Sequence, residues 1–268
     1  MSEIEIDPYE EKPAVISDIS NFDFSKKEIS ITADAKNINL LANVKIDKLW
    51  LFSAKEKDID RIFKIIQPEY VNLYQLLAKD LTCLEQLKCK TLIVDWNTKA
   101  LKLWNLKKNS NLRQLSIRDF SKISNINEIQ NAMELVSLSL EGGMWKPLKI
   151  ESLSPIIHLK KLQYLRLMQI KVADESLEPI SNLNNLKTLE ISNQFPTKEY
   201  AYLSVKLPET ECTMFQPYHK VKINGQDGKL VYDTMITGKR KPFLLSTKDN
   251  ERIKKYTAQF EKLKNQVK

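Results

Sequence analysis

Two histidines and three cysteines are the residues of this chain best suited to nucleophilic, acid–base or metal chemistry. Neither His158 nor His219 neighbours a cysteine or serine in a nucleophile motif, and no G-x-S-x-G, H-E-x-x-H or P-loop sequence occurs. Cys83, Cys89 and Cys212 form no C-x-x-C pair, so neither a zinc ribbon nor a disulfide framework is expected. The sequence therefore predicts no catalytic residue, no cofactor and no metal ligand, and a protein that is not an enzyme.

The composition is that of a globular protein, with 42% hydrophobic and 28% charged residues in a chain of 268. The first twenty residues are rich in acidic side chains and lack an apolar run, which argues against a secretory signal peptide. No stretch of 18 apolar residues occurs, so no membrane span is expected. Sparse cysteines indicate reduced thiols. We expect a cytoplasmic protein, bacterial in type and monomeric.

The positive charge is confined to one end of the chain. Residues 220–268 hold 13 Lys and Arg against 5 Asp and Glu, which gives +8, and the remaining residues hold 29 of each sign. A basic surface is therefore expected only in the last fifth of the chain, where it raises the question of an anionic partner.

Short aliphatic pairs recur along most of the chain, and their first members are separated by steps of 22, 21, 23, 23, 27 and 24 residues. An earlier pair, Ile29/Ile31, is a candidate capping rung. An apolar residue also stands three positions before most pairs. The pairs are Leu49/Leu51, Val71/Leu73, Leu92/Val94, Leu115/Ile117, Leu138/Leu140, Leu165/Leu167 and Leu189/Ile191. Self-similarity of this period is typical of a solenoid, in which each unit buries its apolar face against its neighbours.

The motif resembles that of the leucine-rich-repeat family, L-x-x-L-x-L, most clearly in "NLRQLSI" at 111–117, "KLQYLRL" at 161–167 and "NLKTLEI" at 185–191. The resemblance covers about residues 29–195. The repeat pattern is similar to that of the family's short-repeat type, found in bacterial proteins or phosphatase regulators. It implies an α/β fold: a leucine-rich-repeat solenoid with a parallel β-sheet on the concave face and 3₁₀ or helical returns. The family's buried Asn appears only as Asn97, so less regular turns are expected.

Alternate strand residues are expected to face solvent on the concave sheet. Aromatic residues, Arg and Met are enriched in protein interfaces. A glycine-containing loop at 141–147 interrupts the longest repeat step and is a further candidate. The predicted partner-binding residues are Trp50, Tyr74, Asp95, Arg118, Glu141, Tyr164, Arg166 and Met168, with Trp145 from the loop.

Three alternatives to this prediction remain open. The amino-terminal segment around Ile16, Ile19, Phe22 and Phe24 would cover Trp50 and Phe52. The central charged residues would be plain solvated side chains. Trp145 would fold back over the return segment and pack there.

The chain after residue 195 has a different pattern. A return helix at 197–209 is followed by strands at 213–223 and 229–236, a short strand "FLLS", and a helix at 248–266 capped by Thr247. This module is expected to cap the solenoid. The alternative is an anion-binding surface formed by Lys239, Arg240, Lys241, Arg252 and Lys255.

The predicted organisation is therefore an amino-terminal tail and cap (1–28), a solenoid (29–195) and a carboxy-terminal β-hairpin and helix capping module (196–268). The acidic start of the chain, with Pro8 and Pro13, is expected to be a flexible tail. The predicted function is a non-catalytic scaffold that binds a partner protein on its concave face. Nucleic-acid or anionic-surface binding by 220–268 is the alternative, and an enzyme subunit whose active site lies on a partner is a third hypothesis.

Overall fold

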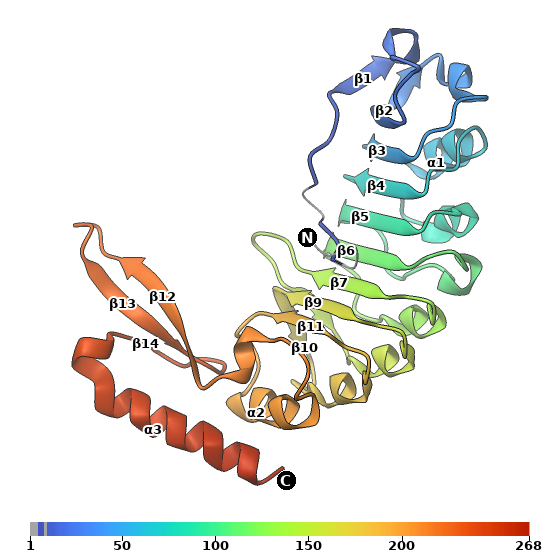
Figure 1. Cartoon of the computed structure of the whole chain (residues 1–268). Coiled ribbons are helices and arrows are strands. Elements are labelled where there is room, and N and C mark those ends of the chain that lie inside the picture. The colour runs from blue at the N-terminus through green and yellow to red at the C-terminus, as the bar shows by residue number, and fades with distance from the viewer. Residues whose placement is uncertain (1–4, 8–9, 268) are drawn as a thin grey trace.

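The computed structural model describes residues 5–7 and 10–267, and its main element is a nine-stranded parallel sheet (Figure 1). Strand order follows chain order, so each repeat adds one strand to the same edge. The strands are β1 (Val15–Asp18), β2 (Glu28–Lys36), β3 (Lys48–Phe52), β4 (Tyr70–Tyr74), β5 (Thr91–Asn97), β6 (Gln114–Phe120), β7 (Ser137–Glu141), β9 (Tyr164–Met168) and β11 (Thr188–Ile191). The predicted solenoid class is confirmed.

The aliphatic pairs align in register through the interior of the sheet. Leu92 lies opposite Leu115, Leu115 opposite Leu138, and the row continues through Leu165 to Leu189. All five side chains are buried. Because side chains alternate along a strand, this register places the intervening residues on the opposite, concave face.

Short 3₁₀ segments return the chain from one strand to the next on the other side of the sheet (Figure 1). A three-residue turn repeat keeps side chains three apart on one face, and Leu153, Ile156 and Leu159 are all buried in this way. The returns are η1 (Ile19–Asn21), η2 (Ile38–Leu41), α1 (Glu56–Phe63), η3 (Leu81–Gln86), η4 (Leu106–Lys108), η5 (Asn127–Asn131), η6 (Ser154–His158) and η7 (Glu178–Asn182).

The turns after the strands are more regular than the sequence predicts. Asn97 is buried, and its amide donates to the carbonyls of Leu76 and Ala78 while its oxygen accepts from the N–H groups of Lys99 and Ala100. In four of the other repeats a left-handed residue performs the turn. Positive φ occurs one position after the last outward strand residue at Ser53, Gln75, Trp96, Asp119 and Gln169.

That left-handed residue reverses the alternation, so the residue after it points inward. Ala54, Leu76, Phe120 and Ile170 are buried at this place. In these four repeats an apolar side chain therefore fills the position of the absent Asn, and the expectation of irregular turns was wrong for them. Gly143 and Gln194 hold the corresponding place after β7 and β11, where the described backbone has no left-handed residue. A second, two-stranded parallel sheet is formed by β8 (Leu148–Ile150) and β10 (Ile170–Val172), which follow β7 and β9 along the chain.

The carboxy-terminal module contains the predicted hairpin and helix. It comprises α2 (Thr197–Lys206), η8 (Thr213–Phe215), β12 (Tyr218–Asn224), β13 (Leu230–Ile236), β14 (Phe243–Leu244) and α3 (Ser246–Asn265). The helix begins at Ser246 with Leu245 as its N-cap residue, so the predicted Thr247 cap was wrong. Asp249 accepts from the Leu245 N–H at 3.1 Å and satisfies that donor instead.

A tight turn docks this hairpin on the last repeat. Gly238 has φ +127°, and a Cβ there would lie 2.0 Å from Oγ1 of Thr197. Its N–H donates to Oδ1 of Asn193 at 2.6 Å, and Thr197 Oγ1 donates to the Thr237 carbonyl at 2.9 Å. Phe260 of α3 belongs to the solenoid core, so the helix covers the end of the repeats.

At the amino end, β1 pairs with β2 and therefore extends the sheet. Pro8 of the predicted flexible tail lies outside the described residues. The three domain boundaries remain predictions. No helix in the described part of the chain combines the length and the hydropathy needed to cross a bilayer.

Candidate protein-binding face

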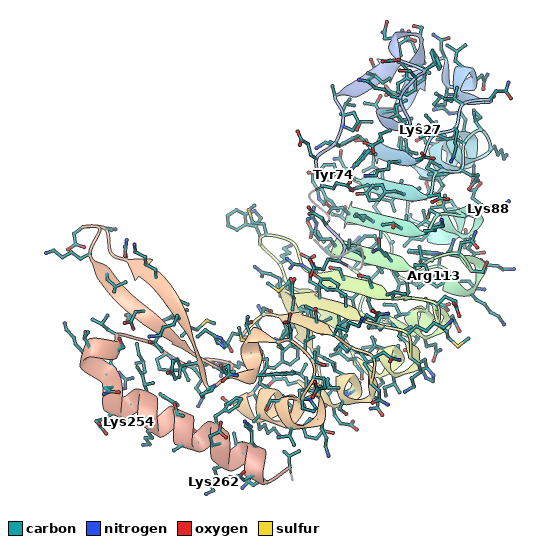
Figure 2. The ribbon with its side chains drawn as sticks, viewed as in Figure 1. Lys27, Tyr74, Lys88, Arg113, Lys254 and Lys262 are labelled. Atoms are coloured by element: carbon teal, nitrogen blue, oxygen red, sulfur yellow. The ribbon has the colours of Figure 1, made fainter. Side chains whose placement is uncertain are left out.

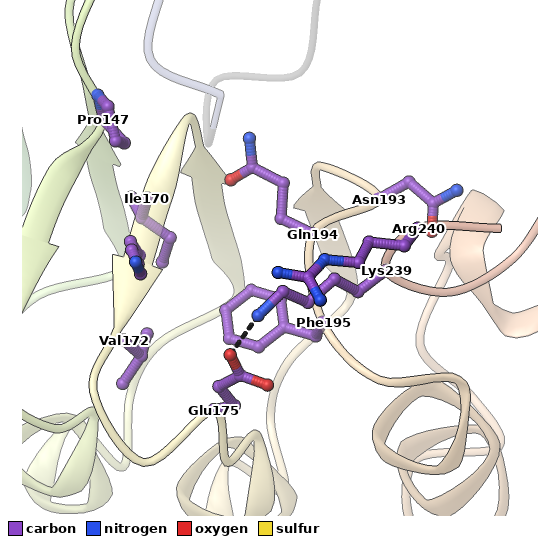
Figure 3. Close-up of a pocket in the computed structure, with 10 residues that line it drawn as sticks. Pro147, Ile170, Val172, Glu175, Asn193, Gln194, Phe195, Lys239 and Arg240 are labelled. Carbon is purple, nitrogen blue, oxygen red and sulfur yellow. Dashed lines mark hydrogen bonds and ion pairs between the residues drawn. The ribbon is translucent and has the colours of Figure 1, made fainter.

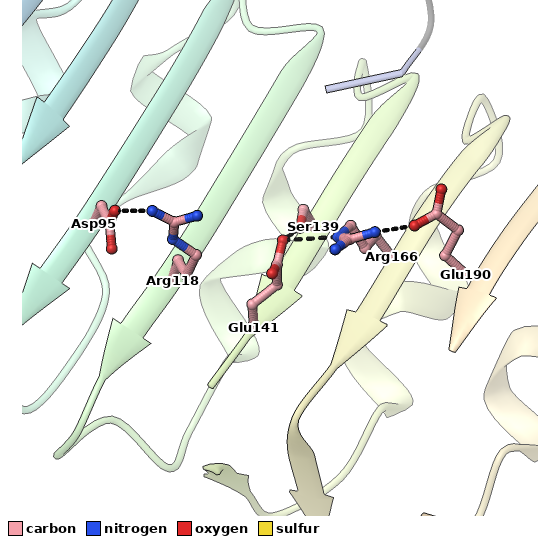
Figure 4. A network of polar contacts seen from close by, with 6 residues as sticks. All are labelled: Asp95, Arg118, Ser139, Glu141, Arg166 and Glu190. Atoms are coloured by element: carbon pink, nitrogen blue, oxygen red, sulfur yellow. Dashed lines mark hydrogen bonds and ion pairs between the residues drawn. The ribbon is translucent and has the colours of Figure 1, made fainter. Parts of the chain in front are cut away.

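The concave face of the sheet carries two groups of ion pairs (Figure 4). Arg118 on β6 pairs with Asp95 on β5. Arg166 on β9 pairs with Glu141 on β7, with 2.9 Å between Nε and Oε1, and with Glu190 on β11. We call these five residues the charge ladder. In-register parallel strands lie about 4.8 Å apart. Asp95, Arg118 and Glu141 stand at equivalent positions, as do Arg166 and Glu190, so charges of alternating sign lie opposite one another. Arg166, which lies opposite Ser139, reaches Glu141 diagonally.

Within the charge ladder the carboxylates of Asp95 and Glu141 are almost fully buried. Glu141 also accepts from the Ser139 hydroxyl at 2.8 Å. The carboxylates on either side raise the pKa of Arg166 above its ordinary value, against the effect of burial, which is the largest influence and lowers it. The central charged residues are therefore held by one another, and the alternative of plain solvated side chains does not describe them.

A hollow of about 470 Å³ opens over the charge ladder at the carboxyl ends of the strands. Its rim is apolar: Tyr74 and Trp96 are 41% and 40% exposed, with 6.0 Å between their ring centroids, and Met144 is 80% exposed. The floor is charged. It is formed by Asp95, Arg118, Asp119, Glu141, Arg166 and Met168.

The 141–147 loop forms one wall of this hollow. A Cβ on Gly143 would lie 2.2 Å from Oδ1 of Asp119, so only glycine allows the loop backbone to approach that carboxylate. Burial, followed by the nearby charge of Asp95, raises the pKa of Asp119. Trp145 at the tip is 89% exposed. It does not pack over the return segment.

These features decide the fold type. An in-register parallel sheet with one strand per repeat of two dozen residues, closed by 3₁₀ returns and turns that bury an Asn or its apolar substitute, is the leucine-rich-repeat arrangement. The chain folds as a leucine-rich-repeat protein.

Comparison with known proteins gives similar folds and low identity. No protein-family model and no curated protein sequence matches the chain. Internalin C2 from Listeria monocytogenes is 22% identical over 60% of this chain and 68% of its own, with a TM-score of 0.41. A leucine-rich-repeat protein from Leptospira interrogans is 21% identical over 68% of this chain, with a TM-score of 0.43, and the match spans about half (52%) of its length.

Four predicted partner-binding residues are buried: Asp95 and Glu141 of the charge ladder, and the aromatic residues Trp50 and Tyr164. Trp50 is 2% exposed and stacks on Tyr70, with ring centroids 5.1 Å apart, and Tyr164 is also buried. Residues 10 and 12 of the amino-terminal segment contact the neighbours of Trp50, whereas Ile16 and Phe22 pack on the solenoid core. The covering segment was thus anticipated, but the residues named for it were wrong.

The basic residues of the carboxy-terminal module are separated and mostly paired. Lys239 pairs with Glu175 at the edge of a hollow of about 380 Å³ (Figure 3), and Arg240 is exposed beside it. Lys241 Nζ lies 5.2 Å from the ring centroid of Tyr256, and Arg252 Nη1 is 2.7 Å from Asp249. Lys255 is exposed on α3. Two of the five predicted anion-binding residues, Lys239 and Arg252, are therefore paired with carboxylates.

Cys83 and Cys89 are buried, Cys212 is half-buried, and His158 is exposed. Burial raises the pKa of Cys83, Cys89 and Cys212 to about 12. Among residues with described positions, no group of three or more His, Cys, Asp or Glu side chains is arranged to hold a metal ion. His219 Nε2 lies 2.9 Å from the Thr237 hydroxyl, which itself donates to the Gln216 carbonyl.

Sequence reasoning missed Trp96, Asp119 and Glu190. The alternating signs at equivalent positions of neighbouring rungs, Asp95, Arg118 and then Glu141, would have indicated cross-strand pairing. Trp96 directly precedes the inward Asn97, which would have placed it outside.

Proposed function

We propose that this leucine-rich-repeat protein is a non-catalytic scaffold that holds a partner protein against the concave face of its sheet. The observation that carries the proposal is the exposed apolar rim of Tyr74, Trp96 and Met144 around the hollow, with the exposed Trp145 next to Met144 in the 141–147 loop. Aromatic and methionine side chains dominate the energetics of protein interfaces. A gathered apolar patch of this kind on a solenoid is typical of a surface that a partner covers.

The charge ladder beneath the rim supports the same role. The guanidinium groups of Arg118 and Arg166 are fixed by buried carboxylates before any partner arrives. Side chains held in place in the free protein lose little conformational entropy on binding, which favours affinity. Charged groups at fixed positions also select partners by electrostatic complementarity.

The test compares two double variants that each replace two exposed apolar side chains with serine. Tyr74→Ser/Trp96→Ser removes the rim, and Leu101→Ser/Met133→Ser removes two exposed apolar side chains, at 63% and 60%, from the segments between strands. A partner is captured with the wild-type protein, identified by mass spectrometry and purified, and its affinity for each variant is measured by calorimetry.

Loss of the two aromatic residues is expected to weaken binding by at least about 30-fold, since a single aromatic residue at the centre of an interface contributes about 2 kcal/mol. The control variant is expected to bind like wild type. Equal binding by the rim variant and weakened binding by the control would show that the partner docks elsewhere.

A further inference from the structure

The segment before β1 lies against the concave sheet. Figure 1 shows it running from β1 alongside β3, β4 and β5. Glu10 accepts a hydrogen bond from Lys48 Nζ of β3 at 2.5 Å, and Lys12 Nζ lies 5.8 Å from the ring centroid of Phe52 at the other end of that strand. Ile6 is 6% exposed. The face therefore already holds a piece of its own chain.

The described residues of this segment are attached through side chains. Their main-chain hydrogen bond, from the Glu10 N–H to the Asp7 carbonyl at 3.3 Å, is internal to the segment. Main-chain pairing with the sheet begins only at Val15, which lies opposite Ser30. Residues held without ladder hydrogen bonds open at a lower free energy than the strands beneath them, so the described residues 5–7 and 10–14 can be displaced while the sheet stays intact.

The surface under the segment has the chemistry of a peptide site. Lys48 Nζ lies 5.7 Å from the ring centroid of Tyr70, and burial together with the charges of Glu10 and Asp7 raises the pKa of that phenol. Trp50 Nε1 is buried without a hydrogen-bond partner among the described residues, as are the hydroxyls of Ser30 and Ser116 on the neighbouring strands.

A buried polar atom without a partner costs about 1–3 kcal/mol. One indole donor and two hydroxyls along the middle of the sheet match the carbonyl and N–H groups that an extended main chain presents. The aromatic pair of Trp50 and Tyr70 suits an apolar side chain of the ligand, and Lys48 suits a carboxylate. Ser30, Trp50 and Ser116 lie on three different strands, so a ligand that crosses the sheet from strand to strand could contact all three.

We infer that the concave face over β3 to β6 is a binding site for an acidic segment of a partner protein, and that residues 5–7 and 10–14 occupy it as an internal ligand. This inference rests on the proposed scaffold function and specifies its partner. The recognised pattern is an aliphatic side chain at the place of Ile6 and a carboxylate four residues later that reaches Lys48. The partner must displace 5–14 to bind.

The tether sets the expected size of the competition. A short flexible linker gives an effective concentration on the order of 1 mM. If the free segment binds with a Kd of about 0.1 mM, the tethered copy fills the site about ten times in eleven. A free peptide should then bind the whole chain about 10-fold more weakly than a chain without the segment.

The experiment uses a fluorescein-labelled peptide of residues 3–14 and a protein that begins at Val15. Fluorescence anisotropy is expected to show saturable binding to the shortened protein and about 10-fold weaker binding to the whole chain. A Glu10→Lys peptide is expected to bind the shortened protein at least about 10-fold more weakly, and Lys48→Glu in that protein is expected to restore it, because the ion pair is reformed in reverse.

Failure of a cooperatively melting shortened protein to bind the peptide at about 1 mM would overturn the inference, as would equal binding of the Glu10→Lys peptide. If the shortened protein does not fold, whole-chain Ile6→Asp/Glu10→Lys replaces it. That variant is expected to bind the peptide about 10-fold more tightly than wild type, and unchanged binding counts against the site.

The two proposals fail separately. If the peptide binds at Lys48 but Tyr74→Ser/Trp96→Ser leaves the partner's affinity unchanged, the peptide site is supported and the rim is excluded as the partner's contact. If partner binding depends on the rim but the peptide does not bind, the rim is supported and the peptide site is excluded.

Discussion

Replacing Arg166 with Met should destabilise the protein through the carboxylate it leaves behind. The Arg166 side chain is 23% exposed, and its partner Glu141 is 6% exposed and has one other donor, the Ser139 hydroxyl. Removing one member of a fully buried ion pair costs about 3–5 kcal/mol. Because Arg166 is partly exposed and Glu190 can turn to water, we expect about 2–3 kcal/mol. For a chain of this size each kcal/mol lowers Tm by about 2–4 °C, so the expected loss is about 4–12 °C.

The assay is thermal unfolding followed by far-UV circular dichroism, with Arg113→Met as the matched control. Arg113 pairs with Glu134 at 3.7 Å, and both side chains are more than 40% exposed, so its loss should cost under about 1 kcal/mol. Adding Glu141→Gln to Arg166→Met should recover about 1–3 kcal/mol, because the buried charge is removed as well. An Arg166→Met protein that melts with the Arg113→Met control would refute the charge ladder as a buried network.

Three further outcomes are expected. Leu138→Ala should lower the free energy of unfolding by about 2–5 kcal/mol in urea titrations, whereas Leu101→Ala, on the surface, should stay within about 0.5 kcal/mol, and equal effects would contradict the interior row. At pH 8 Ellman's reagent should label the three cysteines slowly until urea unfolds the chain, because burial keeps each pKa near 12; rapid labelling of the native protein would disprove their burial. Burial lowers the pKa of His219 below its ordinary 6.5, so the unfolded chain binds the proton at a higher pH than the folded chain does. The stability that this histidine contributes should be fully present above pH 6.5 and be lost as the pH falls through the lowered pKa. If His219→Gln leaves the dependence of stability on pH unchanged, another group causes that dependence.

The solenoid could be predicted because the regular spacing of the aliphatic pairs determines the register of its strands. A one-residue slip in register would expose the row from Leu92 to Leu189 to solvent. Burial therefore requires an aliphatic residue at each of these positions, and that requirement is visible in the sequence. The hairpin was equally visible in its turn residues, Asn224 to Gly228. Local signals of this kind need no knowledge of distant contacts.

The candidate face was less predictable because long-range contacts set its exposure. Trp50 and Tyr164 share the alternation that makes Tyr74 accessible, yet only the three-dimensional path of residues 5–14 and the packing around Tyr164 decide that they are buried. Trp96 escaped notice because it is itself a left-handed residue, which changes the side to which the chain presents its side chains. Neither effect leaves a periodic trace.

Photo-crosslinking tests the concave binding face most directly. Figure 2 shows Tyr74 and Lys88 on opposite sides of the solenoid, so benzoylphenylalanine at either position reports on one side alone. With the purified partner, we predict a single stoichiometric adduct from position 74 and none from position 88. An adduct from position 88 alone would contradict binding on the concave face.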